Sequence, residues 1–242
     1  MTGTTGPIRA VGVVVPAHNE EDLLPACLSA LRDAAETARA AGGGLPVRTV
    51  VVADGCTDRT ALIASSHGAG VVRVSARAVG AARAAGVTEL LRRSSGVKPR
   101  ELWLATTDAD TAVPPNWLAR QLGYAEQGWD AVVGTVTVSD WAGRPARLPA
   151  AFAAHYASGD GTHPHVHGAN LGIRASAYLG AGGFRELATA EDHAIVSALT
   201  RAGFSAARAT DVTVRTSGRP VARAPYGFSC LLGKLAAARQ SA

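Results

Sequence analysis

Residues 47–58 read VRTVVVADGCTD, a short run of β-branched and apolar residues that stops at Asp54. A run of this length is typical of a buried strand, and the aspartate, glycine and threonine after it are typical of a turn. The predicted strands Val11–Val15 and Glu101–Ala105 are also followed by polar clusters. Parallel strands joined by helices end at the same edge of a sheet, and ligands bind at that edge.

The apolar pattern alternates between short runs and longer helical stretches. The predicted strands are Val11–Val15, Val47–Ala53, Val71–Val74, Glu101–Ala105 and Ala131–Val138, and the helices between them are Glu20–Ala41, Asp58–His67, Gly80–Arg93 and Pro115–Gln127. The later third predicts helices at Leu148–Ala157, Ala175–Ala181 and Glu191–Ala202, a strand at Ala169–Ile173, and loose order after Thr210. This pattern predicts an α/β fold, with a mostly parallel central sheet covered by helices on both faces.

The length of 242 residues allows one or two domains, and no linker divides the chain. We expect a flexible N-terminus at residues 1–10, one domain over 11–210, and a basic C-terminal segment at 211–242 that packs on the domain or extends from it. The sequence has no 18-residue apolar run and no secretory signal at its start. Three scattered cysteines favour neither a disulfide framework nor a zinc site. A cytoplasmic protein without a transmembrane segment is expected.

The formal net charge of +5 is unevenly distributed. From Arg201 onward there are seven basic residues and one acid, Asp211, whereas the first 200 residues carry 17 basic and 18 acidic residues. We expect no nucleic-acid partner, because no nucleic-acid-binding module is recognisable. A phosphate-bearing ligand, a peripheral contact with an acidic membrane surface, and a solvated tail all fit this charge. The oligomeric state is not predicted.

The triplet Asp108-Ala109-Asp110 follows a predicted strand and places two carboxylates near one small volume. Such carboxylates repel each other unless a cation or hydrogen-bond donors offset their charge. Magnesium is usually held by one or two carboxylates together with phosphate oxygens, and manganese also favours oxygen ligands. The triplet therefore indicates a divalent metal, with ordinary turn and cap chemistry as the alternative.

With Pro16-Ala17-His18-Asn19-Glu20 and Asp54-Gly55-Cys56-Thr57-Asp58, this triplet resembles the motif series of family 2 glycosyltransferases with the GT-A fold. The segment Gly168–Arg174, Gly182-Gly183-Phe184 and the pair Glu191-Asp192 continue the resemblance. It implies a single GT-A (Rossmann-like) domain that transfers a sugar from a nucleotide-diphosphate donor, by family habit a UDP-sugar. Residues 11–111 then form the nucleotide-sugar-binding half and residues 112–210 the acceptor-binding half.

The resemblance also implies roles for individual residues. Asp54 is expected at the nucleobase, Asp108 at the ribose or donor sugar, and Asp110 at a Mn²⁺ or Mg²⁺ ion. The expected nucleotide-sugar-binding residues are Pro16, Ala17, His18, Asn19, Glu20, Asp54, Arg77, Gly80, Arg83, Asp108, Ala109 and Asp110. The expected acceptor-binding residues are Gly168, Ala169, Asn170, Glu191 and Asp192.

Asp192 is the candidate general base, since an acceptor hydroxyl must lose its proton as it attacks the anomeric carbon. Attack opposite the departing diphosphate would invert the anomeric configuration. The alternative is that Glu191 and Asp192 only stabilise the start of a helix.

The sequence also departs from the family pattern. Cys56 stands where similar enzymes have a small hydroxyl residue or alanine, and Ala53 replaces a common second carboxylate. No QxxRW motif follows Asp192, which argues for single rather than processive transfer. No histidine follows His193, so the sequence shows no third metal ligand in the C-terminal region.

Histidines and aromatic residues in the later third leave several interpretations open. His163, His165 and His167 alternate, so an extended segment would place them on one side. They fit a metal site, an acceptor-side loop or plain surface polarity. Trp141 and Tyr156 are candidates for stacking on a sugar, whereas packing is expected for Trp103, Trp117 and Trp129.

Two further functions remain as alternatives. A nucleotidyltransferase can share a similar sheet and an acidic metal site, although such enzymes usually carry a glycine-rich basic loop where Pro16–Asn19 stands. A non-catalytic nucleotide-sugar-binding protein would retain the fold but not the chemistry.

Overall fold

The computed structural model describes residues 6–156, 162–220 and 228–237, and within them eight strands form one sheet. The strand order is β3-β2-β1-β4-β7-β6-β8-β5. The strands are β1 (Ala10–Ala17), β2 (Val47–Asp54), β3 (Gly70–Val74), β4 (Leu102–Thr106), β5 (Thr111–Ala112), β6 (Ala131–Val138), β7 (Leu171–Arg174) and β8 (Ala206–Thr216). Strands β3, β2, β1 and β4 are parallel, as are β6 and β8, whereas β7 runs antiparallel to β4 and β6, and β5 to β8.

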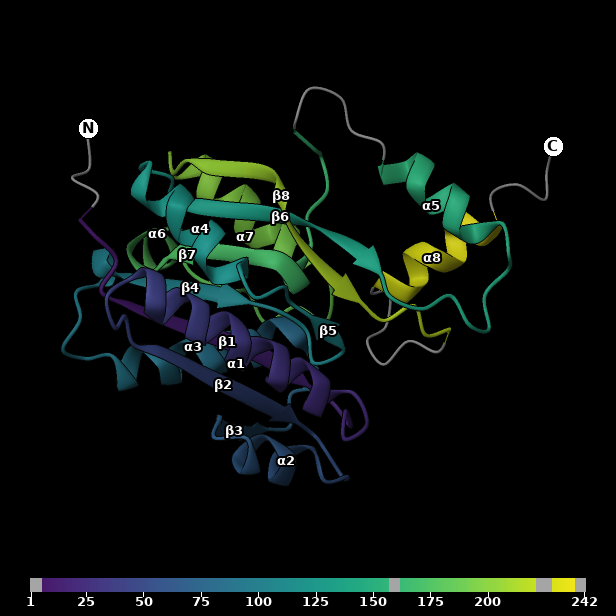
Figure 1. Ribbon diagram of the computed structural model, residues 1–242, viewed down its shortest axis with the longest axis horizontal. Helices are drawn as coiled ribbons and strands as arrows, with labels where there is room; N and C mark the ends of the chain where they lie inside the picture. Colours follow the sequence, from purple (N-terminus) through teal and green to yellow (C-terminus); the bar gives the residue numbers. More distant parts are fainter. Residues whose placement is uncertain (1–5, 157–161, 221–227, 238–242) are drawn as a thin grey trace.

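Helices cover both faces of this sheet (Figure 1). They are α1 (Leu24–Ala41), α2 (Thr60–Ser66), α3 (Val79–Arg93), α4 (Trp117–Glu126), α5 (Leu148–Tyr156), α6 (Ala175–Gly180), α7 (Glu191–Arg201) and α8 (Phe228–Ala237), with short 3₁₀ turns at Pro99–Glu101 and Gly168–Asn170. The structure confirms the predicted α/β fold with a mostly parallel sheet.

Each central strand sends alternate side chains into two separate cores. In β1, Val13 and Val15 pack on the face covered by α1, and Val14 packs on the face covered by α3. A strand buried on both faces has a nearly continuous apolar sequence, and β1 and β2 can be recognised in the sequence for this reason. Close packing of α3 depends on Gly86, because a Cβ there would lie 2.5 Å from the Val14 side chain.

The tryptophans predicted to pack divide into two groups. Trp103 and Trp117 are fully buried, and their ring N–H groups donate to Gln121 and Asn170. Trp129 is only half-buried. Buried indole groups usually find such acceptors, so the first two indoles help to fix the core.

Strand β8 continues through residue 210, the position of the predicted domain boundary and of the predicted start of loose order. Val212, Val214 and Thr216 are buried and alternate with more exposed neighbours, and β8 pairs with β6 as far as Thr216. A bulge interrupts this pairing between Val133 and Thr135. The prediction of loose order is wrong for residues 211–216. Threonines and an arginine make the alternation of buried and exposed positions hard to recognise in the sequence, and the strand that β8 pairs with, β6, is distant in the chain.

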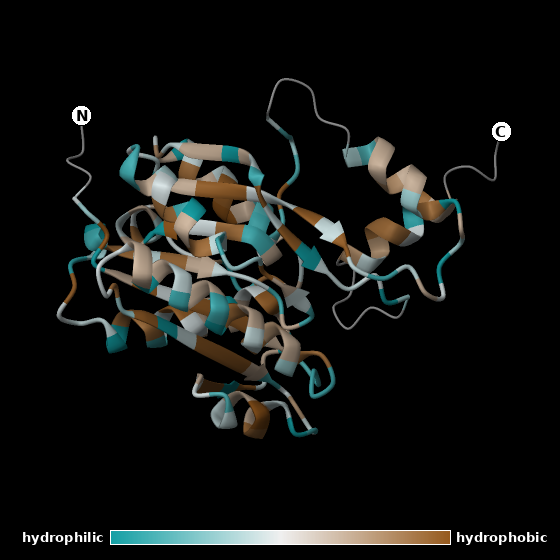
Figure 2. Ribbon diagram, in the orientation of Figure 1, coloured by the Kyte–Doolittle hydropathy of each residue, from teal (hydrophilic) through white to brown (hydrophobic). Residues whose placement is uncertain are grey.

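Helices α5 and α8 lie side by side beyond the ends of β6 and β8 (Figure 1) and are largely apolar (Figure 2). Phe152 of α5 meets Phe228 of α8 with ring centroids 6.0 Å apart, and Trp141 packs on the edge of Phe152. Across the residues that the structure describes, no helix combines the length and the apolar character that crossing a membrane requires.

Candidate active site

The loops that follow β1 and β2 are joined to each other by hydrogen bonds. Nδ1 of His18 donates to the carbonyl oxygen of Asp54 at 2.7 Å, and the Asn19 side chain accepts from the Thr57 N–H at 2.8 Å. The backbone N–H of Glu20 donates to the Thr60 hydroxyl at 2.8 Å. These contacts bring the two predicted polar clusters to one edge of the sheet, as expected from parallel strands.

Cys56 is part of this junction. Its thiol donates to the carbonyl oxygen of Ala17 at 3.3 Å and accepts from the Asn19 N–H at 3.4 Å. A small hydroxyl could make the same two bonds, so the departure from the family pattern at this position preserves the connection.

Asp54 holds the loop that precedes α3. Its two carboxylate oxygens accept the backbone N–H groups of Arg77 at 2.9 Å and Ala78 at 3.0 Å. Arg77 has a left-handed backbone (φ 49°) and an exposed side chain, whose Nε lies close to Gly55. Gly80 is buried, and a Cβ there would lie 2.0 Å from the Arg185 carbonyl oxygen. Gly80 therefore packs against residues 185–187, whereas Arg77 lies at the surface.

Arg83 connects the two halves of the site from a buried position. Its side chain is 3% exposed, and its two terminal nitrogens donate to Asp108 at 2.5 Å and to Glu191. Gly168 makes room for it, because a Cβ there would lie 2.4 Å from the guanidinium carbon. The structure thus places Arg83 in an internal bridge between the DxD triplet and the pair at the start of α7.

Asp108 and Asp110 lie in an environment where negative charge is only partly compensated. Burial and the charge of Asp108 raise the pKa of Asp110 to about 6, and Arg219 opposes this shift. Burial also raises the pKa of Asp108, whereas Arg83 lowers it. Ala109, between them, is buried.

Arg219 is a site residue that sequence reasoning missed. Its guanidinium contacts the Asp110 carboxylate at 3.0 Å and forms two bonds to Glu20, at 2.9 and 2.6 Å. The only signal in the sequence was the basic character of the last 42 residues. Arg219 lies beyond all the recognisable motifs, so no spacing rule could place it.

Asp192 lies half-buried at the start of α7. One carboxylate oxygen accepts the Gly168 N–H at 2.8 Å, and the other accepts the N–H of His193 at 2.7 Å. Arg83 contacts both Asp108 and Glu191, the residue before Asp192, so these groups lie in one neighbourhood. The carboxylate is therefore fixed beside the DxD triplet.

The other predicted acceptor-side residues are buried. Glu191 is 3% exposed and pairs with Arg83, and Ala169 is 6% exposed. Asn170 is fully buried, and its amide nitrogen donates to the carbonyl oxygens of Thr135 and Val212, at 2.8 Å each. Its amide oxygen also accepts from the ring N–H of Trp117. Through these three bonds the Asn170 side chain connects β6, β8 and α4.

The three alternating histidines lie on one side of their segment, as predicted. The rings of His163, His165 and His167 are stacked in a row, and Tyr156 stacks on His165 with centroids 4.1 Å apart. His163 is 2% exposed and donates to the Val133 carbonyl oxygen, whereas His165 and His167 are half-buried. Burial lowers the pKa of His167 to about 4, and Tyr156 contacts its Nε2. The sequence predicts a polar loop over residues 158–168, of which residues 158–161 lie outside the described residues.

A divalent ion would need ligands from a bound molecule as well as from this chain. Among the described side chains, no group of three His, Cys, Asp or Glu residues could hold a metal ion. The Asp110 carboxylate has the chemistry that magnesium and manganese prefer, and a diphosphate would supply the remaining oxygens. The site therefore fits a metal that binds together with a phosphorylated ligand.

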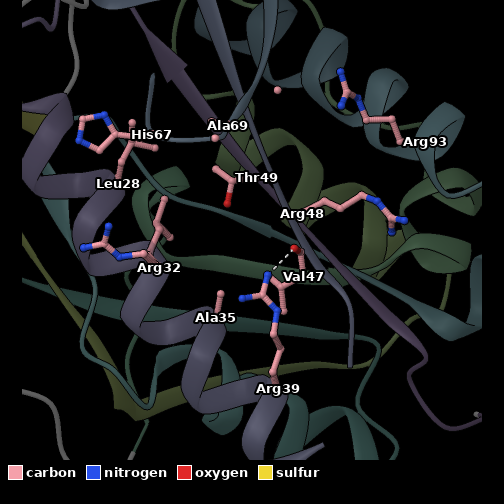
Figure 3. Close-up of a pocket in the computed structure, with 13 residues that line it drawn as sticks. Leu28, Arg32, Ala35, Arg39, Val47, Arg48, Thr49, His67, Ala69 and Arg93 are labelled. Carbon is pink, nitrogen blue, oxygen red and sulfur yellow. Dashed lines mark hydrogen bonds between the residues drawn. The ribbon is translucent and has the colours of Figure 1, made fainter. Parts of the chain in front are cut away.

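A separate cavity of about 280 Å³ lies at the other end of β2 (Figure 3). It is lined by four arginines, Arg32, Arg39, Arg48 and Arg93, as well as apolar residues of α1. Arg39 donates to the Val47 carbonyl oxygen, and the arginine side chains point in different directions (Figure 3). Val47 and Asp54 are seven residues apart along the strand, which is about 23 Å, so this cavity is distinct from the candidate active site.

Comparison with protein families gives a match over most of the chain. The family model described as Glycosyl transferase family 2 matches residues 12–179. A comparison with curated proteins gave no match.

Solved structures with the same fold include a mannosyltransferase and a glucosyl-3-phosphoglycerate synthase. PcManGT, a mannosyltransferase from Pyrobaculum calidifontis solved with GDP-Man and Mn²⁺, has a TM-score of 0.61 and 18% identity over 96% of this chain and 71% of that one. Glucosyl-3-phosphoglycerate synthase from Mycobacterium tuberculosis, solved with Mn²⁺, UDP and glucosyl-3-phosphoglycerate, has a TM-score of 0.55 and 19% identity over 95% and 76%. TarS residues 1–349 from S. aureus give a TM-score of 0.60 and 16% identity, and the match covers 87% of this chain and 61% of that fragment. At these identities the likeness is one of fold.

Proposed function

The chain belongs to glycosyl transferase family 2, and we propose that it is an inverting, non-processive enzyme that transfers a sugar from a nucleotide-diphosphate donor to an acceptor hydroxyl. The observation that carries this proposal is the Arg83 bridge. It joins Asp108, which follows the central strand β4, to Glu191, and so fixes Asp192 beside the DxD triplet. A donor-binding edge and a candidate base thereby share one site.

We assign the nucleoside end of the donor to the loops after β1 and β2. Asp54 and the joined segments 16–20 and 54–60 form a polar rim there, with Arg77 exposed beside it. The proposed donor is a UDP-sugar. Support for a nucleotide-sugar donor comes from structural neighbours that were solved with UDP and with GDP-Man.

We assign Asp110 to a divalent metal, Mn²⁺ or Mg²⁺. When bound, such an ion neutralises charge on the leaving diphosphate. Two neighbours were solved with Mn²⁺, which supports this assignment. On the protein side, Arg83 compensates Asp108, and Arg219 contacts Asp110.

Asp192 is the proposed general base. The acceptor oxygen forms a bond to the anomeric carbon while the bond from that carbon to the diphosphate oxygen breaks, and the electron pair leaves with the nucleotide diphosphate. The hydroxyl proton passes to the Asp192 carboxylate. Two backbone N–H groups, from Gly168 and His193, hold that carboxylate in place, which favours attack from a defined side.

Asp192→Asn tests this proposal. The amide cannot take the proton, so transfer should fall by at least about 100-fold, the range of general-base contributions. Binding of the nucleotide diphosphate, measured by calorimetry with Mn²⁺, should stay within about threefold of wild type. Asp33→Asn, at an exposed position on α1, is the matched control and should change neither quantity.

Three outcomes would contradict the proposal. Near-normal turnover of Asp192→Asn would remove the base assignment. Pyrophosphate release from a nucleoside triphosphate and a sugar phosphate would indicate a nucleotidyltransferase. Donor binding by the wild-type protein without hydrolysis or transfer, across a panel of acceptors, would indicate a non-catalytic binding protein.

A further inference from the structure

Arg219 lies between two acidic side chains of the candidate active site. Its guanidinium forms two bonds to Glu20, which follows β1, and contacts Asp110, which follows β4. The Glu20 side chain is 6% exposed and that of Asp110 is 14% exposed, whereas Arg219 is 25% exposed. A charge-assisted, two-point contact of this kind is strong and geometrically specific.

Two segments of the chain, residues 110–112 and 140–144, hold Arg219 in this position. Strand β8 pairs with β5, the two-residue strand directly after Asp110, and the Ser217 N–H donates to the Asp110 carbonyl oxygen at 3.2 Å. The Arg144 side chain donates to the carbonyl oxygens of Gly218 at 2.9 Å and Arg219 at 2.6 Å. A Cβ at Gly218 would lie 2.0 Å from the Asp140 carbonyl oxygen, so this approach requires glycine.

Arg83 and Arg219 together compensate part of the negative charge of the site. Three carboxylates meet here, those of Glu20, Asp108 and Asp110, and Arg83 pairs with Asp108. Arg219 therefore compensates the two carboxylates that Arg83 does not reach. A divalent cation that binds Asp110 meets a carboxylate already in contact with a guanidinium.

On the basis of the proposed function, we propose that Arg219 is an internal cation that competes with the divalent metal for Asp110. In the free protein the guanidinium holds Asp110 and Glu20, so a metal ion binds only by displacing it. A nucleotide diphosphate favours this exchange, because it brings further oxygen ligands for the metal and new acceptors for the displaced guanidinium. The metal and the donor then bind together rather than separately.

The test is the affinity for Mn²⁺ without any nucleotide, measured by electron paramagnetic resonance of the free ion. Arg219→Ala should bind Mn²⁺ at least about tenfold more tightly than wild type, a difference of about 1.4 kcal/mol. Arg215→Ala is the matched control, since Arg215 lies four residues before Arg219, near the end of β8, and is exposed. Its Mn²⁺ affinity should equal that of wild type. Equal or weaker binding by Arg219→Ala would overturn the inference.

Two further variants distinguish the effect of the positive charge from an effect on folding. Arg219→Lys keeps the positive charge and should bind Mn²⁺ within about threefold of wild type, whereas Arg219→Gln removes it and should follow Arg219→Ala. Circular dichroism identifies any variant that is not folded. If Arg219→Ala does not fold, the Mn²⁺ affinities of Arg219→Lys and Arg219→Gln are compared instead. Equal affinities of these two variants would overturn the inference.

The outcomes for the two proposals are distinguishable, since this experiment needs neither donor nor turnover. Tighter Mn²⁺ binding by Arg219→Ala, with no transfer activity in the wild-type protein, would leave the competition standing and remove the proposed function. Transfer activity of the wild-type protein, with equal Mn²⁺ affinities of wild type and Arg219→Ala, would support the proposed function and overturn the competition.

Discussion

The loops after β1 and β2 and the bridge at Arg83 lie at the same edge of the sheet but are built from different interactions. The loops are joined largely by bonds of neutral groups, such as those of Asn19 and Cys56, between segments whose strands are direct neighbours. The bridge joins the buried charges of Arg83 and Glu191, 108 residues apart in the chain, to the partly exposed Asp108, 25 residues from Arg83. A neutral hydrogen bond contributes about 1 kcal/mol, whereas breaking a buried ion pair costs about 3–5 kcal/mol. The loops can therefore adjust around a ligand, while the bridge fixes the two halves relative to each other.

The largest expected effect comes from removing the bridge. Arg83→Met should lower the free energy of unfolding by about 3–5 kcal/mol, because Glu191 is left charged in a buried position. Chemical denaturation measures the change. Adding Glu191→Gln should restore part of the loss. Arg92→Met on the same helix removes an exposed arginine that pairs with Glu89 and should cost less than about 1 kcal/mol. Equal costs for the two arginines would contradict the contrast between bridge and surface.

A smaller effect should follow the titration of Asp110. Burial and the charge of Asp108 raise its pKa to about 6 from the ordinary 3.8, so the folded protein binds this proton more tightly than the unfolded chain does. The contribution of Asp110 to stability is therefore greatest at low pH and falls as the pH rises from about 4 through 6. Relative to wild type, Asp110→Asn should gain on the order of 2 kcal/mol between pH 4 and pH 7.

This prediction is checked by denaturation of both proteins across that pH range without added metal. Asp33→Asn, exposed on α1, serves as the control and should show no such gain. A difference between Asp110→Asn and wild type that stays constant with pH would show that the Asp110 carboxylate is well compensated, like the polar groups of the loops.

The smallest expected effect belongs to the loops. Cys56→Ser replaces the thiol with a hydroxyl that can donate to Ala17 and accept from Asn19, so the free energy of unfolding should change by less than about 1 kcal/mol. Nucleotide binding should also be preserved. Thermal unfolding with and without a nucleotide diphosphate measures both. A loss of 3 kcal/mol or more would place this loop junction among the rigid parts of the site.

Much of the first half of the site could be predicted because each motif directly follows its own strand. The apolar runs of β1 and β2 are continuous, so the positions of Asn19, Asp54 and the DxD triplet at one edge follow from parallel pairing. The placement of the three histidines on one side of their segment could also be predicted, since it needs only the alternation of an extended segment; their stacking is seen only in the structure.

The second half could not be predicted in the same way. Arg83 was expected near the donor, but its two bonded partners are decided by the packing of α3 against the start of α7. Asn170 was expected to bind the acceptor, but its amide is engaged with Thr135, Val212 and Trp117, from three other elements. Local spacing carries no information about partners that distant in the chain.

The sequence by itself determined the α/β fold, the family, and the clusters that follow the strands, because all of these depend on short-range periodicity and on residues adjacent in the chain. Only the tertiary structure decided which charges meet. Strand β8 continues past residue 210 and pairs with β5, and this brings Arg219 to Asp110 and Glu20 from a segment without a recognisable motif. Ion pairs between distant segments depend on how sheet and helices pack, and that packing is a property of the whole chain.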